Sequence, residues 1–215
     1  GGHCTTAPVD GFGCIGFGPV VPGAIRSAYP IGGAQKAQDY EVLPEGVYYR
    51  VPLRGLLYWN SHAFNLTAQD HMMNGRINFM FSKEPRYRSR NLGRESVANL
   101  FLPRTPPFEK EEVCGTVTLP KGAHLFALSS HTHKRGERFW IENPNGELLY
   151  ENFLYNDPDR LILDPPLVFD SEEESARTLT YCALYNNGVA EDGTPDPETV
   201  TRASRMPDSV NIIGV

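Results

Sequence analysis

The sequence predicts an all-β protein, most simply a β-sandwich. No long segment repeats apolar residues at the i, i+3, i+4, i+7 spacing of an amphipathic helix, whereas several short segments alternate apolar and polar residues. Glycine (20 residues) and proline (18 residues) are abundant and are spread along the chain rather than gathered in one tract. This combination is typical of many short strands joined by turns.

The expected strands can be followed along most of the chain. In order they cover residues 47–51, 55–66, 76–81, 113–119, 124–133, 138–142, 148–150 and 178–185. The first is rich in β-forming residues. Segments 76–81 and 113–119 alternate, so we expect both to bury one face.

Turns and irregular stretches separate these strands. Pro144, Asn145 and Gly146 predict a hairpin turn between two strands, and the run 186–188 predicts the end of the last strand. Charged residues crowd into 82–90 where the apolar pattern stops, which predicts a domain boundary. The polar tail 191–205 predicts a loop.

Composition and charge exclude two classes of protein. The formal net charge is -6, from 20 basic and 26 acidic residues, whereas a nucleic-acid binder needs a concentrated basic patch. No apolar stretch approaches the roughly 18 residues that a membrane span requires. Hydrophobic residues make up 40% of the chain, which is enough for a core. The chain begins without Met and ends in the apolar run 211–215, so we expect a fragment of a longer protein.

The four cysteines lack the close C-x2-C spacing of a zinc site. Cys4 and Cys14 flank a glycine-rich turn and could be bridged. The alternative for all four is that they are free, buried thiols.

Histidines carry the strongest chemical signal. In a strand, His131 and His133 would point to the same face with Cα atoms roughly 6–7 Å apart, close enough to share one metal ion. The alternative is two half-exposed strand histidines. His124 falls on the opposite face and predicts a packed or hydrogen-bonded side chain. His62 follows an apolar strand, so it needs a hydrogen-bond partner or a metal. His71 is expected to be solvated.

Five segments carry a family resemblance through their order and spacing. They are 43–51, 59–62, 119–127, 131–136 and 181–182. Together they resemble the copper type II, ascorbate-dependent monooxygenases, whose members include the peptidylglycine hydroxylating monooxygenases and dopamine β-monooxygenase. The resemblance covers about residues 20–188, and the step of seven residues from His124 to His131 matches the family closely.

The resemblance implies two jelly-roll β-sandwich domains with one copper ion each. Residues 1–83 would be the rear part of the first domain, and 84–215 most of the second. His62 would bind one copper ion, while His131 and His133 would bind the other together with a methionine. Ascorbate would reduce both ions, and O2 would hydroxylate a C–H bond of a small-molecule or peptide-like substrate. The implied protein is a secreted or periplasmic oxidoreductase. Imidazole ligands suit both copper oxidation states.

Four further expectations follow from this family resemblance. The sequence has no adjacent histidine pair, so the copper ion at His62 would lack two family ligands. The methionine ligand is expected beyond Val215, because Met206, the one methionine after Cys182, stands in a loop context. Ser129 replaces an arginine that binds the substrate carboxylate in peptide-hydroxylating members, so a peptide with a C-terminal glycine is not the expected substrate. Secretion implies oxidised cysteines, with the partners of Cys114 and Cys182 expected past Val215.

Two other interpretations remain open from the residues themselves. Glu137 follows His133 by four residues, as in the first motif of the cupins, and would complete a mononuclear metal site with His131 and His133. The third interpretation is a non-catalytic, secreted β-sandwich interaction module without a metal.

Overall fold

The computed structural model divides into two compact units. It describes residues 3–4, 11–12, 14–15, 18–19, 38–51, 54, 66–72, 75–89, 105–132 and 134–200. The first unit includes Glu45–Ser89, and the second includes Gly32–Pro44 together with everything after Ser89. The assignment of 1–83 and 84–215 to two family domains stays a prediction.

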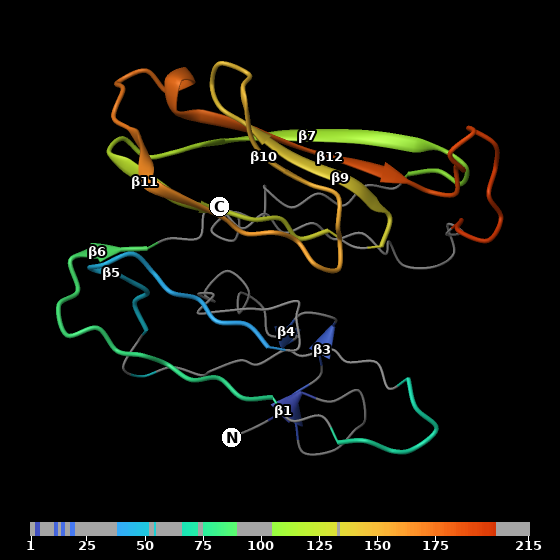
Figure 1. Ribbon diagram of the computed structural model, residues 1–215, viewed down its shortest axis with the longest axis horizontal. Coiled ribbons are helices and arrows are strands. Elements are labelled where there is room, and N and C mark those ends of the chain that lie inside the picture. The colour runs from blue at the N-terminus through green and yellow to red at the C-terminus, as the bar shows by residue number, and fades with distance from the viewer. Residues whose placement is uncertain are drawn as a thin grey trace. The chain divides into compact units, whose positions relative to one another are not determined.

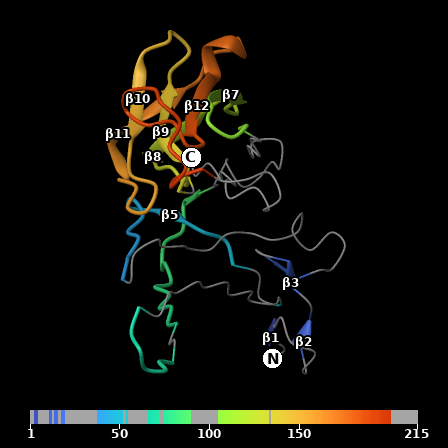
Figure 2. The same ribbon diagram turned by 90° about the vertical axis from the view of Figure 1, so that its right-hand side faces the viewer.

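The second unit contains two antiparallel sheets. The larger has the strand order β10-β9-β12-β7 and consists of β7 (Lys110–Thr118), β9 (Gly136–Glu142), β10 (Leu148–Asn152) and β12 (Thr178–Asn186). The smaller pairs β8 (Ala123–Leu128) with β11 (Leu161–Phe169). Both can be followed in Figure 1 and, turned by 90°, in Figure 2. The predicted all-β sandwich is confirmed.

The core lies between these sheets, because alternate residues of each strand point inward. Burial alternates along all nine residues of β7, which is paired in register with β12 over its whole length. One hydrophobic cluster joins both sheets and comprises Leu119, Leu125, Leu128, Phe139, Ile141, Tyr150, Phe169, Leu179, Tyr181, Ala183 and Tyr185. Burying a side chain of this size stabilises a fold by roughly 1.5–3 kcal/mol.

Glycine is required where the Tyr181 ring crosses β7. Gly115 lies directly opposite Tyr181, and a Cβ at this position would come within 2.6 Å of the phenol oxygen. The missing side chain therefore makes room for an aromatic ring in the core.

Two predicted turns are confirmed. Between β9 and β10 the Asn143 Oδ1 atom accepts hydrogen bonds of 2.9 Å from the backbone N–H groups of Asn145 and Glu147. Gly146 has φ +80°, a left-handed conformation that glycine adopts without steric cost. After β12 the chain turns at Gly188, which has φ +91°. The described part of the predicted tail loop, 191–200, contains no strand or helix.

The first unit has only two-residue strands in its described part. They are β1 (His3–Cys4), β2 (Gly11–Phe12), β3 (Cys14–Ile15), β4 (Gly18–Pro19), β5 (Val47–Tyr48) and β6 (Tyr87–Arg88). The predicted strand 47–51 is thus shorter than expected and pairs in parallel with β6. The predicted strand 55–66 lies outside the described residues except for Leu66.

The predicted strand 76–81 is wrong. These residues belong to no strand, and all of them are exposed, with Met80 and Phe81 at 88% and 85% of full exposure. Alternation stabilises a strand only when a partner strand and a second layer cover its apolar face. No described residue pairs with this segment.

β11 was not predicted from the sequence, because two prolines interrupt its apolar residues. Pro165 and Pro166 lie where the register with β8 shifts, between Ile162 and Leu167, and the Asp164–Pro165 bond is cis. Proline removes a ladder hydrogen bond, so it is tolerated in a strand at such an irregularity. The described part of the chain contains no helix with the length and apolarity needed to cross a membrane.

Candidate functional site

The His131 segment begins where β8 ends. The prediction of one strand over 124–133 is wrong in its last part, because β8 stops at Leu128. The alternation of faces nevertheless continues: Ser130 and Thr132 are 5% and 4% exposed, and His131 between them is only partly buried. His133 and His62 lie outside the described residues, so the structure locates one of the three predicted metal ligands.

Ser130 is held by a buried polar network from β10. Its hydroxyl lies 3.2 Å from the Tyr150 hydroxyl and accepts a hydrogen bond of 3.1 Å from Asn152 Nδ2. Tyr150 donates its single proton to the backbone carbonyl of Asp159 at 2.6 Å, so the Ser130 hydroxyl must donate to Tyr150. Asn152 uses its second proton on the Leu154 carbonyl at 2.9 Å. Every polar hydrogen of these three side chains therefore has an acceptor.

Electrostatics keep this network in one protonation state. Burial raises the pKa of the Tyr150 phenol above its usual value, and the hydrogen bond with Ser130 offsets part of this rise. The phenol therefore stays protonated at neutral pH and remains a donor to Asp159. The network fixes the backbone immediately before His131.

Thr132 is held on the other side of His131 by close packing. A Cβ on Gly136 would lie 2.8 Å from Thr132 Cβ and 2.9 Å from its Oγ1, distances that real side chains do not adopt. Gly136 is itself buried and pairs with Tyr185 of β12. The His131 segment therefore folds back onto the start of β9, and only glycine allows this approach.

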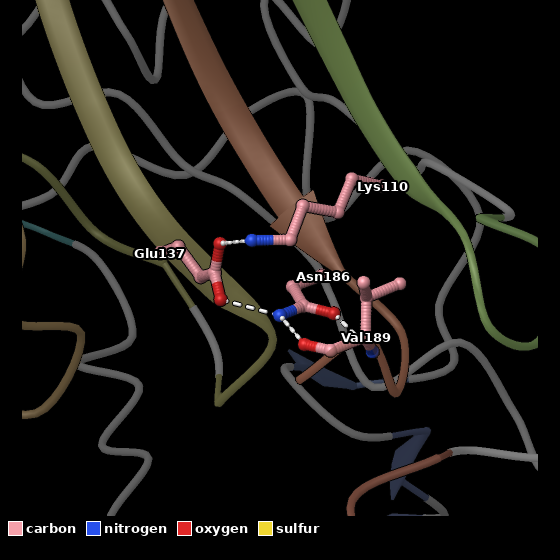
Figure 3. Close-up of polar contacts among 4 residues, drawn as sticks. All are labelled: Lys110, Glu137, Asn186 and Val189. Carbon is pink, nitrogen blue, oxygen red and sulfur yellow. Dashed lines mark hydrogen bonds and ion pairs between the residues drawn. The ribbon is translucent and has the colours of Figure 1, made fainter. Parts of the chain in front are cut away.

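A β-bulge at the start of β9 sets the position of Glu137. Tyr185 pairs with Gly136 and Leu184 pairs with Arg138, so Glu137 is the extra residue on β9. Its Oε2 atom forms an ion pair of 2.9 Å with Lys110 Nζ, as Figure 3 shows.

The other oxygen of Glu137 is also engaged. Oε1 accepts a hydrogen bond from Asn186 Nδ2. Asn186 additionally donates to the Val189 carbonyl and accepts from the Val189 N–H, both at 2.7 Å (Figure 3). Its backbone N–H donates to the Arg135 carbonyl at 2.9 Å. Because both carboxylate oxygens have partners on β7 and β12, the cupin-like interpretation gains no support from Glu137.

His124 and His71 are both exposed. His124 on β8 pairs with Val168 and is exposed, which corrects the expectation of a packed or hydrogen-bonded side chain. His71 is exposed, as expected for a solvated side chain.

Cys114 and Cys182 form a disulfide with each other. The prediction that their partners lie past Val215 is wrong, because the register of β7 and β12 sets these two residues directly opposite one another. Strand pairing across 68 residues is not visible in cysteine spacing. The side chains of Cys4 and Cys14 lie outside the described residues.

Glu112 lies beside this disulfide, with Oε1 3.8 Å from Cys114 Sγ. The two sulfurs and a carboxylate oxygen lie within 4.8 Å of one another. The sulfurs are bonded to each other and are not thiolates, so this cluster is no copper ligand set in its oxidised form.

Charged and aromatic side chains lie next to the disulfide on the same face of the larger sheet. Trp140 pairs with Cys182 across β9 and β12 and is 6% exposed. The Arg138 guanidinium lies 4.3 Å from the indole centroid and forms an ion pair of 2.6 Å with Glu151. This stacking covers part of the ring next to the disulfide.

The residues that anchor His131 were not predicted from the sequence. The signals present were a serine directly before the histidine and a polar residue, Asn152, just after the predicted strand 148–150. Comparison of the whole sequence with known proteins adds no further constraint: no family model matches it, and no curated protein matches it significantly.

Proposed function

We propose that this chain is part of a copper-dependent monooxygenase that hydroxylates a C–H bond of a small organic substrate, with O2 as oxidant and ascorbate as electron donor. The observation that carries the proposal is the His131-Thr132-His133 segment, in which buried neighbours hold a partly exposed histidine. The resemblance of the surrounding segments to the copper type II monooxygenases supplies the reaction class.

The setting of His131 fits a metal ligand. Its backbone is fixed before the residue by Ser130 and after it by Thr132, so the imidazole is held without being sealed in the core. Preorganised ligands of this kind lose little freedom when an ion binds. Copper would be held by His131 and His133, with a second ion at His62.

Copper, when bound, would supply one-electron exchange with ascorbate and O2. The residues of the chain would orient the ligands. Ser130, Tyr150 and Asn152 hold one end of the segment, and the contact between Thr132 and Gly136 holds the other.

The proposal also includes an oxidising cellular compartment and a jelly-roll topology for the second unit. A disulfide between β7 and β12 supports an oxidising compartment, either outside the cell or in a periplasm. The sandwich of the second unit supports a jelly-roll domain of the family type.

Copper titration tests the proposal. The double variant His131→Ala/His133→Ala should lose one tight copper site, while His62→Ala should leave that site intact and weaken the binding of the second ion. His124→Ala is a matched control, because His124 is an exposed histidine on β8, seven residues before His131. Its copper stoichiometry should equal that of the wild type.

Unchanged copper stoichiometry in the double variant would contradict the metal site. Ascorbate-dependent O2 consumption by the copper-loaded protein tests the reaction class separately. Absence of any such consumption over a range of small organic substrates, with both ions bound and ascorbate present, would contradict the proposed monooxygenase reaction.

A further inference from the structure

Three potential ligands converge on the outer face of the β7–β12 pair. Cys114 and Cys182 are directly opposite in register, with Cα atoms 4.1 Å apart. Glu112 precedes Cys114 by two residues and therefore shares its side of β7. The sulfur atoms and a carboxylate oxygen of Glu112 all lie within 4.8 Å of one another.

Glu112 has no charged partner in the part of the chain that the structure describes. Among the residues that the structure describes, no basic side chain forms an ion pair with it. Its neighbour at 3.8 Å is Cys114 Sγ, and a disulfide sulfur carries no proton to donate. A carboxylate without an ion pair among the described residues thus lies against two sulfurs, which cannot act as thiolate ligands while they are bonded to each other.

We propose that reduction of the Cys114–Cys182 disulfide converts this cluster into a binding site for a divalent cation of the zinc type. A dithiol reductant donates two electrons and two protons to the Cys114–Cys182 disulfide. The protein then carries two thiols, and the reductant is oxidised to a cyclic disulfide. The cation then displaces the two thiol protons into solvent and binds two thiolates and the Glu112 carboxylate.

The ligand chemistry selects the cation. Two thiolates and one carboxylate, with water in the fourth position, suit the tetrahedral geometry of zinc and cadmium. Two ligand atoms each about 2.3 Å from one ion lie at most about 4.6 Å apart, so only small side-chain rotations are needed once the S–S bond is broken.

The sheet holds the ligands in place after reduction. β7 and β12 are paired through nine consecutive residue pairs, and Cys182 lies in the interior of that ladder. Cys182 is 4% exposed whereas Cys114 and Glu112 are exposed, so a cation reaches the site from the β7 side. The site shares no residue with the proposed copper site and does not rest on that proposal.

Cadmium titration of the chain carrying Cys4→Ser and Cys14→Ser tests the inference without interference from the other two cysteines. The readout is the ultraviolet thiolate-to-cadmium charge-transfer band, to which histidines do not contribute. The protein reduced with a water-soluble phosphine should bind one cadmium ion with this band, and the oxidised protein should show none.

Two variants assign the ligands. Cys114→Ser should abolish the two-thiolate band. Glu112→Gln should weaken cadmium binding by at least about tenfold, because removing even an outer-shell partner of a metal site typically costs 10–100-fold. Glu109→Gln is the matched control, an exposed glutamate just before β7, and should leave the affinity unchanged.

Three results would overturn the inference. The first is a charge-transfer band of undiminished intensity in Cys114→Ser, where Cys182 alone remains to supply a thiolate. The second is equal affinity in Glu112→Gln, a change of an exposed side chain that leaves the fold intact. The third is loss of the β-sheet circular dichroism signal on reduction, because the site requires the sheet.

Discussion

Gly136→Ala tests whether close packing holds the His131 segment. The new Cβ would lie 2.8 Å from Thr132 Cβ, 2.9 Å from Oγ1 and 3.2 Å from Cγ2. Because carbon atoms in contact are about 3.6 Å apart, Thr132 must move by about 0.8 Å. Thr132 is 4% exposed, so surrounding atoms block this movement, and overpacking of this kind typically costs about 1–3 kcal/mol.

The expected result is a fall of about 1–3 kcal/mol in the free energy of unfolding, measured by urea denaturation. Copper affinity at the proposed site should fall by about tenfold, because Thr132 connects both histidines and a displacement costing about 1.4 kcal/mol changes binding by that factor. Gly146→Ala is the control. Its Cβ meets open space, so only the left-handed turn is strained, and copper affinity should not change.

A double-mutant cycle separates this contact from other effects. Thr132→Gly removes the atom that a new Cβ would strike, so the variant carrying Thr132→Gly and Gly136→Ala should be more stable than the sum of the single variants by about 1 kcal/mol or more. Additive changes within about 0.5 kcal/mol would show that the contact between positions 132 and 136 is not what Gly136 provides.

Three further predictions concern Tyr185, the Cys114–Cys182 disulfide and Asn152. Tyr185 is 1% exposed and its hydroxyl has no hydrogen-bond partner among the described residues, so Tyr185→Phe should raise the free energy of unfolding by about 1 kcal/mol. Burial raises the pKa of Tyr185, with a smaller contribution from Glu111. The free energy of unfolding of the wild type should therefore be independent of this group below about pH 10. Above that pH it should decline, because Tyr185 loses its proton in the unfolded chain before it does so in the folded one. Tyr185→Phe should flatten this alkaline decline in urea unfolding, and an unchanged slope would contradict the argument. Cys114→Ser opens a loop of 68 residues and should cost about 4 kcal/mol, with the reduced wild type matching it; a loss below about 1 kcal/mol would refute the loop argument. Asn152→Ala should cost about 1–3 kcal/mol in thermal or urea unfolding, whereas the exposed Asn145→Ala should not, and equal effects would count against the Ser130 network.

Local patterns were sufficient for the strands of the larger sheet. Segments 113–119, 138–142, 148–150 and 178–185 all correspond to strands, because alternation and turn chemistry act within a few residues. The pattern was insufficient at 76–81, where no partner strand covers the alternating face. It was misleading at Leu161–Phe169, where an irregular register accommodates the prolines.

The candidate site depended on contacts that sequence spacing does not encode. The alternation of strand faces correctly placed His131 on the opposite side from the buried Ser130 and Thr132, although β8 ends before these residues. The pairing of Cys114 with Cys182 and the bulge at Glu137 both follow from register, which is set by the packing of whole sheets. Register of this kind is a long-range property, and no short motif predicts it.

The position of Trp140 beside the disulfide has an optical consequence. Residues directly opposite on adjacent strands have Cβ atoms about 4.5–5.5 Å apart, and Trp140 is opposite Cys182. An excited indole readily gives an electron to a neighbouring disulfide, which quenches its emission. The chain has two tryptophans, so in a Trp59→Phe background the emission of Trp140 would reveal the state of the bond in real time without any added dye.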